Sequence, residues 1–190
     1  MEGSCNGGGA AVNSYALVSY LADPLAAFLN RLRNDLVDEC HAKAHVTVLP
    51  PRPLPCASLE AWLQLQECLQ DVQPFEVELG DIEVFPVTDV IYLSLRAGYR
   101  ELEKLHVALN RGALAFQEPF TYHPHLTLAQ HVTPDQLTAA TAEASECWHD
   151  FKGPRSFLVD RLTFVQNTLG NEWLDLNAFQ LAGPLEAVRR

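Results

Sequence analysis

A four-residue phrase occurs twice in this chain, and that repetition constrains the fold more than any other feature. His-Val-Thr-Val occupies residues 45–48 and His-Leu-Thr-Leu occupies residues 125–128, so the copies are 125 − 45 = 80 positions apart. Both copies alternate as a half-buried strand does. Because residues i and i+2 of a strand point to the same face, the histidine and threonine of each copy face one way and the two aliphatic residues the other.

The elements around the two copies follow the same order of strand, helix, strand, helix and strand. Periodicity and turn residues place the first set at 15–21, 23–39, 45–48, 58–72 and 75–85, and the second at 89–97, 99–116, 125–128, 133–151 and 155–166. One more β-run follows at 171–179. Ile82 and Val84 match Leu162 and Phe164 at the same offset of 80 (162 − 82). We interpret this as an internal duplication; a coincidental likeness between two amphipathic α/β halves is the alternative.

The duplication predicts an α+β fold of two lobes related by a pseudo-two-fold axis. We expect antiparallel-rich sheets with the helices outside and an active-site cleft between the lobes. One bilobal domain would span residues 13–182, with a first repeat at about 13–96 and a second at about 90–182. Residues 1–12 and 183–190 are expected to be flexible tails. The glycines of the first tail are not a phosphate loop, because no Gly-Lys-Ser/Thr follows them.

Three helix starts carry recognisable signals. Asp23 can cap the first predicted helix, with Pro24 at its first position. Ser58 is the expected cap of the second helix. Thr133 is that of the fourth, where Pro134 takes the first position.

The composition favours one globular domain and limits its partners. The chain has 190 residues, of which 48% are hydrophobic, enough for a sizeable core. It carries 13 basic and 24 acidic side chains, for a net charge of −11. Long nucleic acid is held largely by Lys and Arg on its phosphates, so a groove for a long duplex is not expected. A small anionic ligand, or one end of a strand, needs only a local positive spot.

Several features bear on where the protein works. No apolar run approaches the length needed to cross a bilayer, and the start lacks the basic and apolar regions of a signal peptide. The five cysteines are odd in number and share no Cys-x-x-Cys spacing, which favours reduced thiols. We therefore expect a cytoplasmic monomer without membrane partners.

Two histidines that face each other across a cleft suit phosphodiester chemistry. If the lobes pack about the axis, the histidine–threonine faces of both phrases converge on one cleft. A neutral imidazole then removes a proton from the attacking oxygen, and an imidazolium donates one to the leaving oxygen. The threonine hydroxyls can donate hydrogen bonds to the non-bridging phosphate oxygens. This scheme needs no metal and no cofactor.

The two His-x-Thr-x phrases, the sequence HPHLTLA around the second and the bilobal repeat resemble the two-histidine (2H) phosphoesterase superfamily. The branch of 2'-5' RNA ligases and cyclic phosphodiesterases looks most similar, over roughly residues 12–181. The resemblance implies a metal-independent enzyme that opens 2',3'-cyclic phosphates or cleaves 2'-5' linkages, with ligation as the reverse reaction. Carried over by position, the catalytic pair is His45 and His125. The phosphate binders are then Thr47 and Thr127.

The chain departs from this resemblance in one place. Members of the branch often have a basic residue just after the second phrase, where this chain has Gln130. Arg52, a few residues past the first phrase, is a candidate for the missing charge. The alternative interpretation of Arg52 is a solvated loop residue between prolines.

Further candidates for the substrate pocket flank the two phrases. Lys43 and His41 share a strand face with His45 if the alternation runs back that far, although a solvated strand start would also explain both. His123 shares a face with His125. The pair could be read as metal ligands, but no carboxylate or cysteine cluster completes a ligand set, so no metal is predicted.

Three aromatic residues, Tyr122, Tyr92 and Trp173, could stack on a base in the pocket. Because Tyr92 and Trp173 occupy comparable places in the two repeats, a core role is expected for at least one of them. His106 lies on a helix stripe and is expected to be structural.

Two classes of function follow from these observations. The first is a 2H phosphodiesterase acting on a nucleotide or RNA end, or on a small cyclic or 2'-5'-linked nucleotide signal. The second is a non-catalytic nucleotide- or RNA-end-binding module that keeps the cleft. Intact histidine and threonine in both phrases favour the enzyme. For hydrolysis of a 2',3'-cyclic phosphate, we assign His125 as the base for water and His45 as the acid for the departing ribose oxygen.

Overall fold

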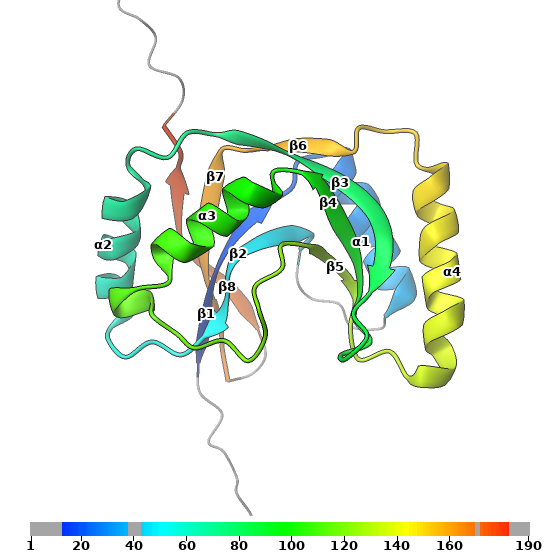
Figure 1. The fold of residues 1–190 in the computed structure, drawn as a ribbon, viewed down its shortest axis with the longest axis horizontal. Helices are drawn as coiled ribbons and strands as arrows, with labels where there is room; N and C mark the ends of the chain where they lie inside the picture. The colour runs from blue at the N-terminus through cyan, green and yellow to red at the C-terminus, as the bar shows by residue number, and fades with distance from the viewer. Residues whose placement is uncertain (1–12, 38–42, 170–171, 183–190) are drawn as a thin grey trace, which may run out of the picture.

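The structure is a computed structural model that describes residues 13–37, 43–169 and 172–182 (Figure 1). In chain order, the elements within these residues are β1 (Ser14–Tyr20), α1 (Leu25–Leu36), β2 (His45–Arg52), α2 (Ser58–Leu69), β3 (Phe75–Val84), β4 (Ile91–Ala97), α3 (Tyr99–Leu109), the 3-10 helix η1 (Gly112–Leu114), β5 (Leu126–Ala129), α4 (Pro134–Asp150), β6 (Ser156–Val159), β7 (Arg161–Asn167) and β8 (Trp173–Gln180). The predicted tails lie outside the described residues. None of the described helices is long and apolar enough to span a membrane.

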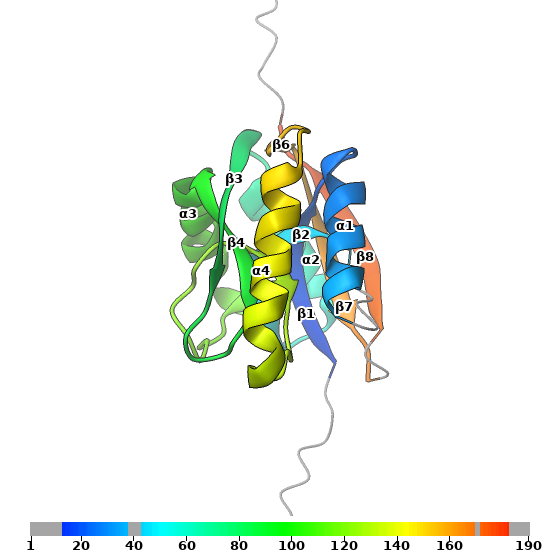
Figure 2. The same ribbon diagram turned by 90° about the vertical axis from the view of Figure 1, so that its right-hand side faces the viewer.

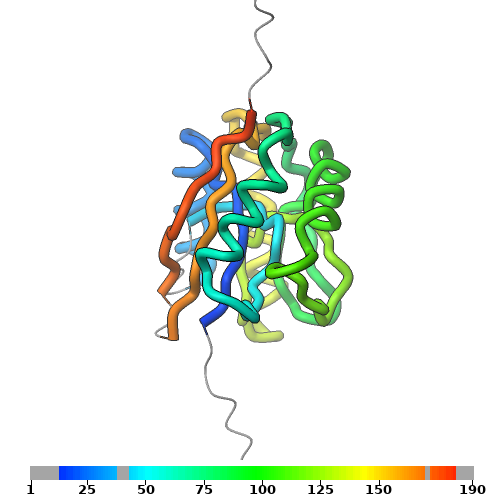
Figure 3. The backbone as a smooth tube through the Cα atoms, turned by 90° about the vertical axis from the view of Figure 1, so that its left-hand side faces the viewer, coloured from blue at the N-terminus to red at the C-terminus, as the bar shows by residue number. Residues whose placement is uncertain are grey.

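Two four-stranded sheets form the centre of the molecule. Their strand orders are β2-β1-β7-β8 and β5-β4-β3-β6, and all neighbouring strands are antiparallel. Helices α1 and α4 lie side by side at one end (Figure 2), and α2 and α3 lie together at the opposite end (Figure 3). The predicted α+β fold, with antiparallel sheets and helices outside them, is confirmed.

Each half of the chain contributes a strand to the sheet of the other half. Strand β3, from the first half, pairs with β4 in the sheet of the second histidine phrase, and β7 pairs with β1 in the sheet of the first. In the ladder between β3 and β6, Val77 pairs with Phe157, its own equivalent at the offset of 80 (157 − 77). When a residue of an antiparallel pair faces its own equivalent, a two-fold axis passes between them. The pseudo-two-fold axis of the duplicated unit therefore crosses this ladder.

The β-run predicted at 155–166 is two strands rather than one. Strand β6 pairs with β3 in one sheet, and β7 pairs with β1 and β8 in the other. Asp160 separates them, and its main-chain oxygen accepts hydrogen bonds from the Leu181 N–H at 2.7 Å and from Gln180 Nε2 at 2.8 Å. The break was missed because a single residue takes the chain from one apolar strand into the next, in another sheet.

The helix starts follow the predictions in part. Thr133 is the N-cap of α4 and Pro134 its first residue, as predicted, although the Thr133 hydroxyl bonds a side chain instead of the helix backbone. Pro24 is the N-cap of α1 rather than its first residue, while the Asp23 carboxylate accepts a hydrogen bond from the backbone of the first turn. The prediction for Ser58 was wrong, because Ser58 is the first helical residue of α2 and not its cap.

The alternation predicted for the two histidine phrases is confirmed. Val46 and Val48 of β2 and Leu126 and Leu128 of β5 are at most 1% exposed, and they belong to one hydrophobic core. The histidine and threonine of each phrase are only partly buried. Burial of the aliphatic face fixes each strand, so the polar face is turned away from that core.

Candidate active site

One cleft collects the polar faces of both histidine strands. It has a volume of about 1050 Å³, and residues of both sheets and of the segment 116–123 line it. His45 and Thr47 line it from β2. Thr127 lines it from β5, and His125 from the position directly before that strand. The structure thus brings together the four residues that the repeated phrase singled out.

The two imidazoles are held in the same way. Nδ1 of His45 lies 2.6 Å from the main-chain oxygen of Lys43, and Nδ1 of His125 lies 2.6 Å from that of His123. A carbonyl oxygen can only accept, so each Nδ1 carries a hydrogen and donates it. Nε2 is then the ring nitrogen left to exchange a proton with a ligand. The carbonyl comes from residue i − 2 in both copies, so the contact repeats with the sequence.

Both histidines have a lowered pKa in the unliganded protein. Loss of hydration, with smaller contributions from the positive charges of Arg33 and of protonated His125, lowers the pKa of His45 to about 4. The pKa of His125 is lowered as well, mainly by loss of hydration and in part by His123. Burial disfavours the imidazolium form, so both rings are neutral at neutral pH. Because protonation of one ring opposes protonation of the other, their titrations are coupled.

The two threonines occupy equivalent places in their sheets. Thr47 pairs with Val18 of β1, and Thr127 pairs with Tyr92 of β4. Both line the cleft beside the histidine of the same strand. A hydroxyl can rotate to donate to an oxygen of a bound anion, so the cleft offers one such donor from each lobe.

The surroundings of His45 are polar and charged. Tyr20, its partner across β1, meets the imidazole edge-on at 6.3 Å between ring centroids. The Tyr20 hydroxyl donates to Asp175 at 2.5 Å, and the Lys43 ammonium bonds the other oxygen of that carboxylate at 3.3 Å. Arg33 of α1, which is 5% exposed, lines the same cleft. Lys43 therefore lines the cleft with a largely exposed side chain, and its charge is shared with an acidic side chain.

The surroundings of His125 are aromatic. Phe85 and Tyr92 meet its ring edge-on at 4.9 and 5.3 Å, and they stack on each other at 4.0 Å. The Tyr92 hydroxyl donates to Glu83 at 2.9 Å. His123 lines the cleft, as predicted, with its ring centroid 6.4 Å from that of His125. The imidazole of His125 is thus supported by rings rather than by charges.

The two aromatic candidates at comparable repeat positions have different places. Tyr92 is 4% exposed and lies beneath His125 without lining the cleft, so it is a core residue. Trp173 lines the cleft at the start of β8 and packs against the small apolar cluster of Ala16 and Val18. The expectation that at least one of the pair is a core residue is confirmed.

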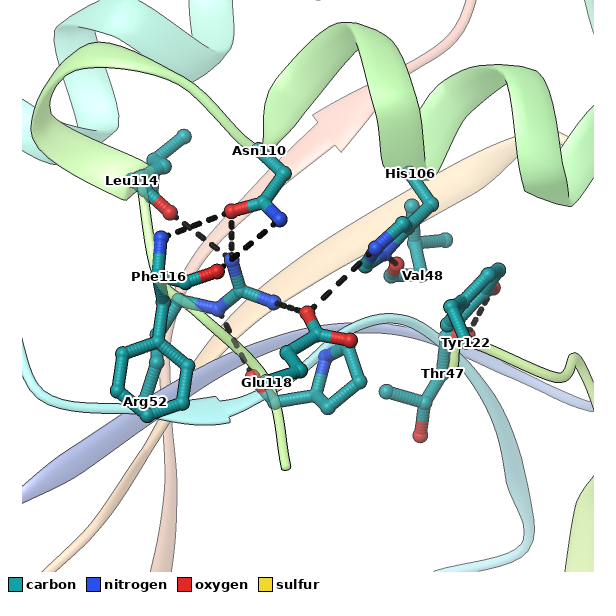
Figure 4. Close-up of polar contacts among 10 residues, drawn as sticks. Thr47, Val48, Arg52, His106, Asn110, Leu114, Phe116, Glu118 and Tyr122 are labelled. Carbon is teal, nitrogen blue, oxygen red and sulfur yellow. Dashed lines mark hydrogen bonds and ion pairs between the residues drawn. The ribbon is translucent and has the colours of Figure 1, made fainter. Parts of the chain in front are cut away.

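Arg52 was predicted wrongly in both interpretations. It is 1% exposed and lies at the end of β2, so it is neither a solvated loop residue nor a lining residue of the cleft. Figure 4 shows its guanidinium enclosed by three acceptors: Glu118 at 2.5 Å, Asn110 at 2.9 Å and the main-chain oxygen of Leu114 at 2.8 Å. The main-chain oxygen of Pro50 accepts a further hydrogen bond at 2.9 Å. The buried Glu118 carboxylate neutralises the charge, which explains why Arg52 can be buried.

Tyr122 lines the cleft but is fixed by the protein. Its hydroxyl donates to the main-chain oxygen of Thr47 at 2.7 Å, and its ring stacks on His106 at 3.9 Å (Figure 4). His106 in turn donates from Nδ1 to the Val48 oxygen at 3.0 Å, and its Nε2 lies 3.5 Å from Glu118. Tyr122 therefore holds the first histidine strand, β2, in place, and His106 covers one face of its ring. The structural role predicted for His106 is confirmed.

Sequence reasoning missed three residues of the site. Tyr20 could have been found from the pairing of β1 with β2, since it directly faces His45. Phe85 and Arg33 carried no such signal, because only the packing of remote elements brings them to the cleft. His41 lies outside the described residues. Among the residues that the structure describes, no three His, Cys, Asp or Glu side chains are arranged to hold a metal ion.

The sequence of this chain matches a known protein family. The profile of the 2'-5' RNA ligase superfamily matches residues 21–171. The chain belongs to this superfamily. A protein of Halalkalibacterium halodurans, whose name assigns it provisionally to the phosphoesterases, is 23% identical over 141 residues, 72% of this chain and 78% of that protein. A Bacillus cytotoxicus protein with the same kind of name is 30% identical over 91 residues, 47% of this chain and 52% of that protein.

Solved structures share the fold of this superfamily member. The apo crystal structure of E. coli LigT matches 90% of this chain and 98% of its own chain, with a TM-score of 0.60 at 20% identity. Usb1 of Kluyveromyces marxianus matches 90% and 99%, with a TM-score of 0.54 at 12% identity. At this identity the likeness establishes the fold alone.

Proposed function

We propose that this protein is a phosphodiesterase that opens 2',3'-cyclic phosphates or cleaves 2'-5' linkages at a nucleotide or RNA end. Membership of the superfamily and the phosphoesterase names of the relatives support phosphodiesterase-type chemistry. One observation carries the finer proposal. Two imidazoles from equivalent strands line one cleft, each with Nδ1 bound to a carbonyl and Nε2 left for proton transfer.

The proposed hydrolysis of a cyclic phosphate needs two proton transfers. Nε2 of His125 accepts a proton from water as the water oxygen attacks phosphorus. The bond from phosphorus to one ribose oxygen breaks, and protonated His45 donates its Nε2 proton to that oxygen. The products are a ribose hydroxyl and a phosphate monoester, and one proton has moved from His45 to His125. Ligation follows the same path with a ribose hydroxyl of a second strand in place of the attacking water, and it is the reverse of 2'-5' cleavage.

The lowered pKa of His45 sets a condition on this assignment. With a pKa of about 4, His45 is neutral in the unliganded protein at neutral pH and cannot act as an acid. A bound phosphodiester carries a negative charge, which favours the imidazolium form and raises the pKa of His45. Binding of the substrate therefore promotes the protonation that His45 needs to act as the acid.

The threonine hydroxyls complete the proposed site. Thr47 and Thr127 each lie two residues after the histidine of the same phrase, and each lobe contributes one of them. Charge on the non-bridging oxygens increases as the attacking oxygen bonds to phosphorus. Donors already in place stabilise that charge without reorganisation, so they act more on the transition state than on the bound substrate.

The lining of the cleft favours a small nucleotide over a long strand. Many lining residues are apolar or aromatic, and the acidic Glu118 and Asp175 accompany the basic Arg33 and Lys43. A phosphate backbone several nucleotides long would need more cations. Crystal structures of E. coli LigT, which shares the fold, are described as complexes with 3'-AMP, ATP and NADP+. Ligands of that size fit a cleft of about 1050 Å³.

The proposal is tested by a substrate panel with identification of products. The purified protein is incubated with 2',3'-cyclic mononucleotides, 2'-5'-linked dinucleotides, 3'-5'-linked dinucleotides and RNA ends that carry a cyclic phosphate. We expect turnover of the cyclic or 2'-5'-linked substrates and none of the 3'-5'-linked controls. Tight binding of these nucleotides without any turnover would instead establish a non-catalytic binding module.

A further inference from the structure

A phosphate bound between the two histidines needs a positive charge near it, and the cleft offers few. The chain is acidic overall, with 13 basic against 24 acidic residues. Among the described residues that line the cleft, the Lys and Arg side chains are Lys43 and Arg33. A general acid–base pair alone does not stabilise the charge that develops on the non-bridging oxygens, so the source of this charge matters.

Two of the nearby cations are already neutralised. The Lys43 side chain is 66% exposed, and its ammonium is paired with Asp175 at 3.3 Å. Arg52 lies outside the cleft lining, with its guanidinium paired to the Glu118 carboxylate at 2.5 Å. Lys43 is thus an exposed side chain at the cleft, and Arg52 is a buried side chain outside it.

Arg33 differs from both in position, because it is buried and also lines the cleft. It lies in the last turn of α1, is 5% exposed, and lines the cleft together with His45. Helix α1 packs against β5, the strand of the second phrase, and Gln130 at the end of that strand lines the same cleft. Helix α1 therefore brings a buried arginine from outside both phrases into the lining of the cleft.

We infer that Arg33 binds the phosphate of the substrate and supplies the cationic charge of the active site. This inference rests on the proposed function and adds a ligand to it. A guanidinium presents five N–H donors in a planar fork, which matches two oxygens of a phosphate. Arg33 also has a further interaction within the protein, and five donors allow it to hold that partner and a phosphate at once. Arginine stays protonated at any working pH, so it does not compete with the histidines for protons.

Electrostatics of the site agree with this placement. The positive charge of Arg33 contributes to lowering the pKa of His45, as does the charge of protonated His125. Such effects fall off with distance, so the guanidinium and both imidazoles belong to one charged centre. An anion between them would be stabilised by all three.

Phosphate binding by the folded protein tests the inference without turnover. Binding of inorganic phosphate is measured by calorimetry for the wild type, Arg33→Met, Arg33→Lys and Arg31→Met. Arg31 is exposed on the same helix and does not line the cleft, so it is a matched control for loss of one charge. We expect roughly ten- to a thousand-fold weaker binding in Arg33→Met, partial recovery in Arg33→Lys, and wild-type binding in the control. Equal binding in all four proteins, or none in the wild type, would overturn the inference.

Two further measurements separate phosphate binding from a purely structural role. In Arg33→Met without ligand, the pKa of His45 followed by NMR should rise, because a neighbouring positive charge has been removed. In the double variant Arg33→Met/Gln130→Arg, the new guanidinium at the end of β5 should restore part of the phosphate affinity. An unchanged pKa of His45 together with no rescue would assign Arg33 to packing. If Arg33→Met does not fold, Arg33→Gln and Arg33→Lys replace it in the same assays.

Failure of the inference can be told apart from failure of the proposed function. If the wild type turns over cyclic phosphates and Arg33→Met keeps the wild-type kcat/KM, the enzyme stands and the role of Arg33 is wrong. If phosphate binding depends on Arg33 but no phosphodiester is turned over, the anion site stands and the enzyme proposal is wrong.

Discussion

The sites of His45 and His125 have the same backbone geometry and different surroundings. Both rings donate from Nδ1 to the carbonyl two residues earlier, and both stand beside a threonine on a strand whose other face is buried. Around His45 the neighbours are charged or hydroxylated, including Arg33 and the Lys43–Asp175 pair. Around His125 they are mainly the rings of an aromatic cluster.

This difference teaches how a duplicated unit can carry out an asymmetric reaction. The strand pattern repeats with the sequence, so it gives two imidazoles with equivalent backbone contacts. The acid and the base must nevertheless be in different protonation states at one moment, and only unequal surroundings can bias that choice. Substitutions can remove an element that the two sites share or change one that belongs to a single site.

The largest effect is expected from removal of the shared imidazoles. His45→Ala or His125→Ala should lower kcat/KM for a 2',3'-cyclic nucleotide by roughly a hundred- to ten-thousand-fold. The double variant should lose far less than the product of the two effects, because the pair acts as a unit. Steady-state kinetics with circular dichroism as a folding control measure this. Wild-type rates in both single variants would make the repeated phrase structural.

The same variants also separate the two roles. A phosphodiester with an activated phenol as leaving group needs little protonation of the departing oxygen. On this substrate, His45→Ala should lose little of the wild-type rate, while His125→Ala should still lose most of it. If His125→Ala is instead the variant that keeps its rate on this substrate, His125 is the acid and His45 the base.

A smaller loss is expected from removal of the shared hydroxyls. Thr47→Val and Thr127→Val keep the shape of the side chain but remove the donor to phosphate. Each should lower kcat by about ten- to a thousand-fold with little change in KM, because the hydroxyl acts mainly in the transition state. Thr47→Ser and Thr127→Ser, which keep the donor, are the matched controls. A wild-type kcat in both valine variants would contradict the assigned role.

The pH dependence should report the unequal and coupled titration of the two sites. In the unliganded protein both histidine pKa values are lowered, that of His45 to about 4. The bell-shaped profile of kcat/KM, which reports the free enzyme, should therefore centre below the ordinary histidine value of about 6.5. Bound phosphate raises both pKa values, so the profile of kcat should lie at higher pH. A kcat profile at the same or lower pH than that of kcat/KM would argue against a rise in the pKa of His45 on substrate binding.

The hydrogen bond from Tyr122 to the first histidine strand has no counterpart among the described contacts of the second strand. Its removal should have a modest effect on kcat. Tyr122→Phe removes the hydrogen bond to the Thr47 carbonyl but keeps the ring stacked on His106. One lost hydrogen bond is worth about 0.5–1.5 kcal/mol, so kcat should fall roughly two- to tenfold. A wild-type kcat in Tyr122→Phe would show instead that the hydrogen bond to the Thr47 carbonyl does not help to position the first strand for catalysis.

No effect is expected from chelation. The proton transfers and the charge stabilisation are assigned to side chains, so activity should be the same with and without excess EDTA. Rates are compared after prolonged dialysis against the chelator, with a metal-dependent phosphodiesterase as a positive control. Loss of activity that a divalent ion restores would revive the reading of His123 and His125 as metal ligands.

The sequence by itself determined the face of each histidine strand and the duplicated order of elements. Those features follow from local rules, because a strand has a period of two residues and Val46 or Leu126 must be buried wherever the strand lies. The four residues of the repeated phrase could therefore be placed in one site without coordinates. The offset of 80 residues extended this to a two-fold arrangement, which the pairing of Val77 with Phe157 reproduces.

Only the tertiary structure decided which charges enter the cleft and where the strands go. Arg52 is close in sequence to the first phrase, yet Glu118, 66 positions away, draws it into a buried pair. Arg33 stands at the edge of an ordinary helical stripe, yet the packing of α1 on β5 brings it into the lining of the cleft. Burial of a charge depends on partners that only the folded chain brings near it, so local periodicity carries no information about it.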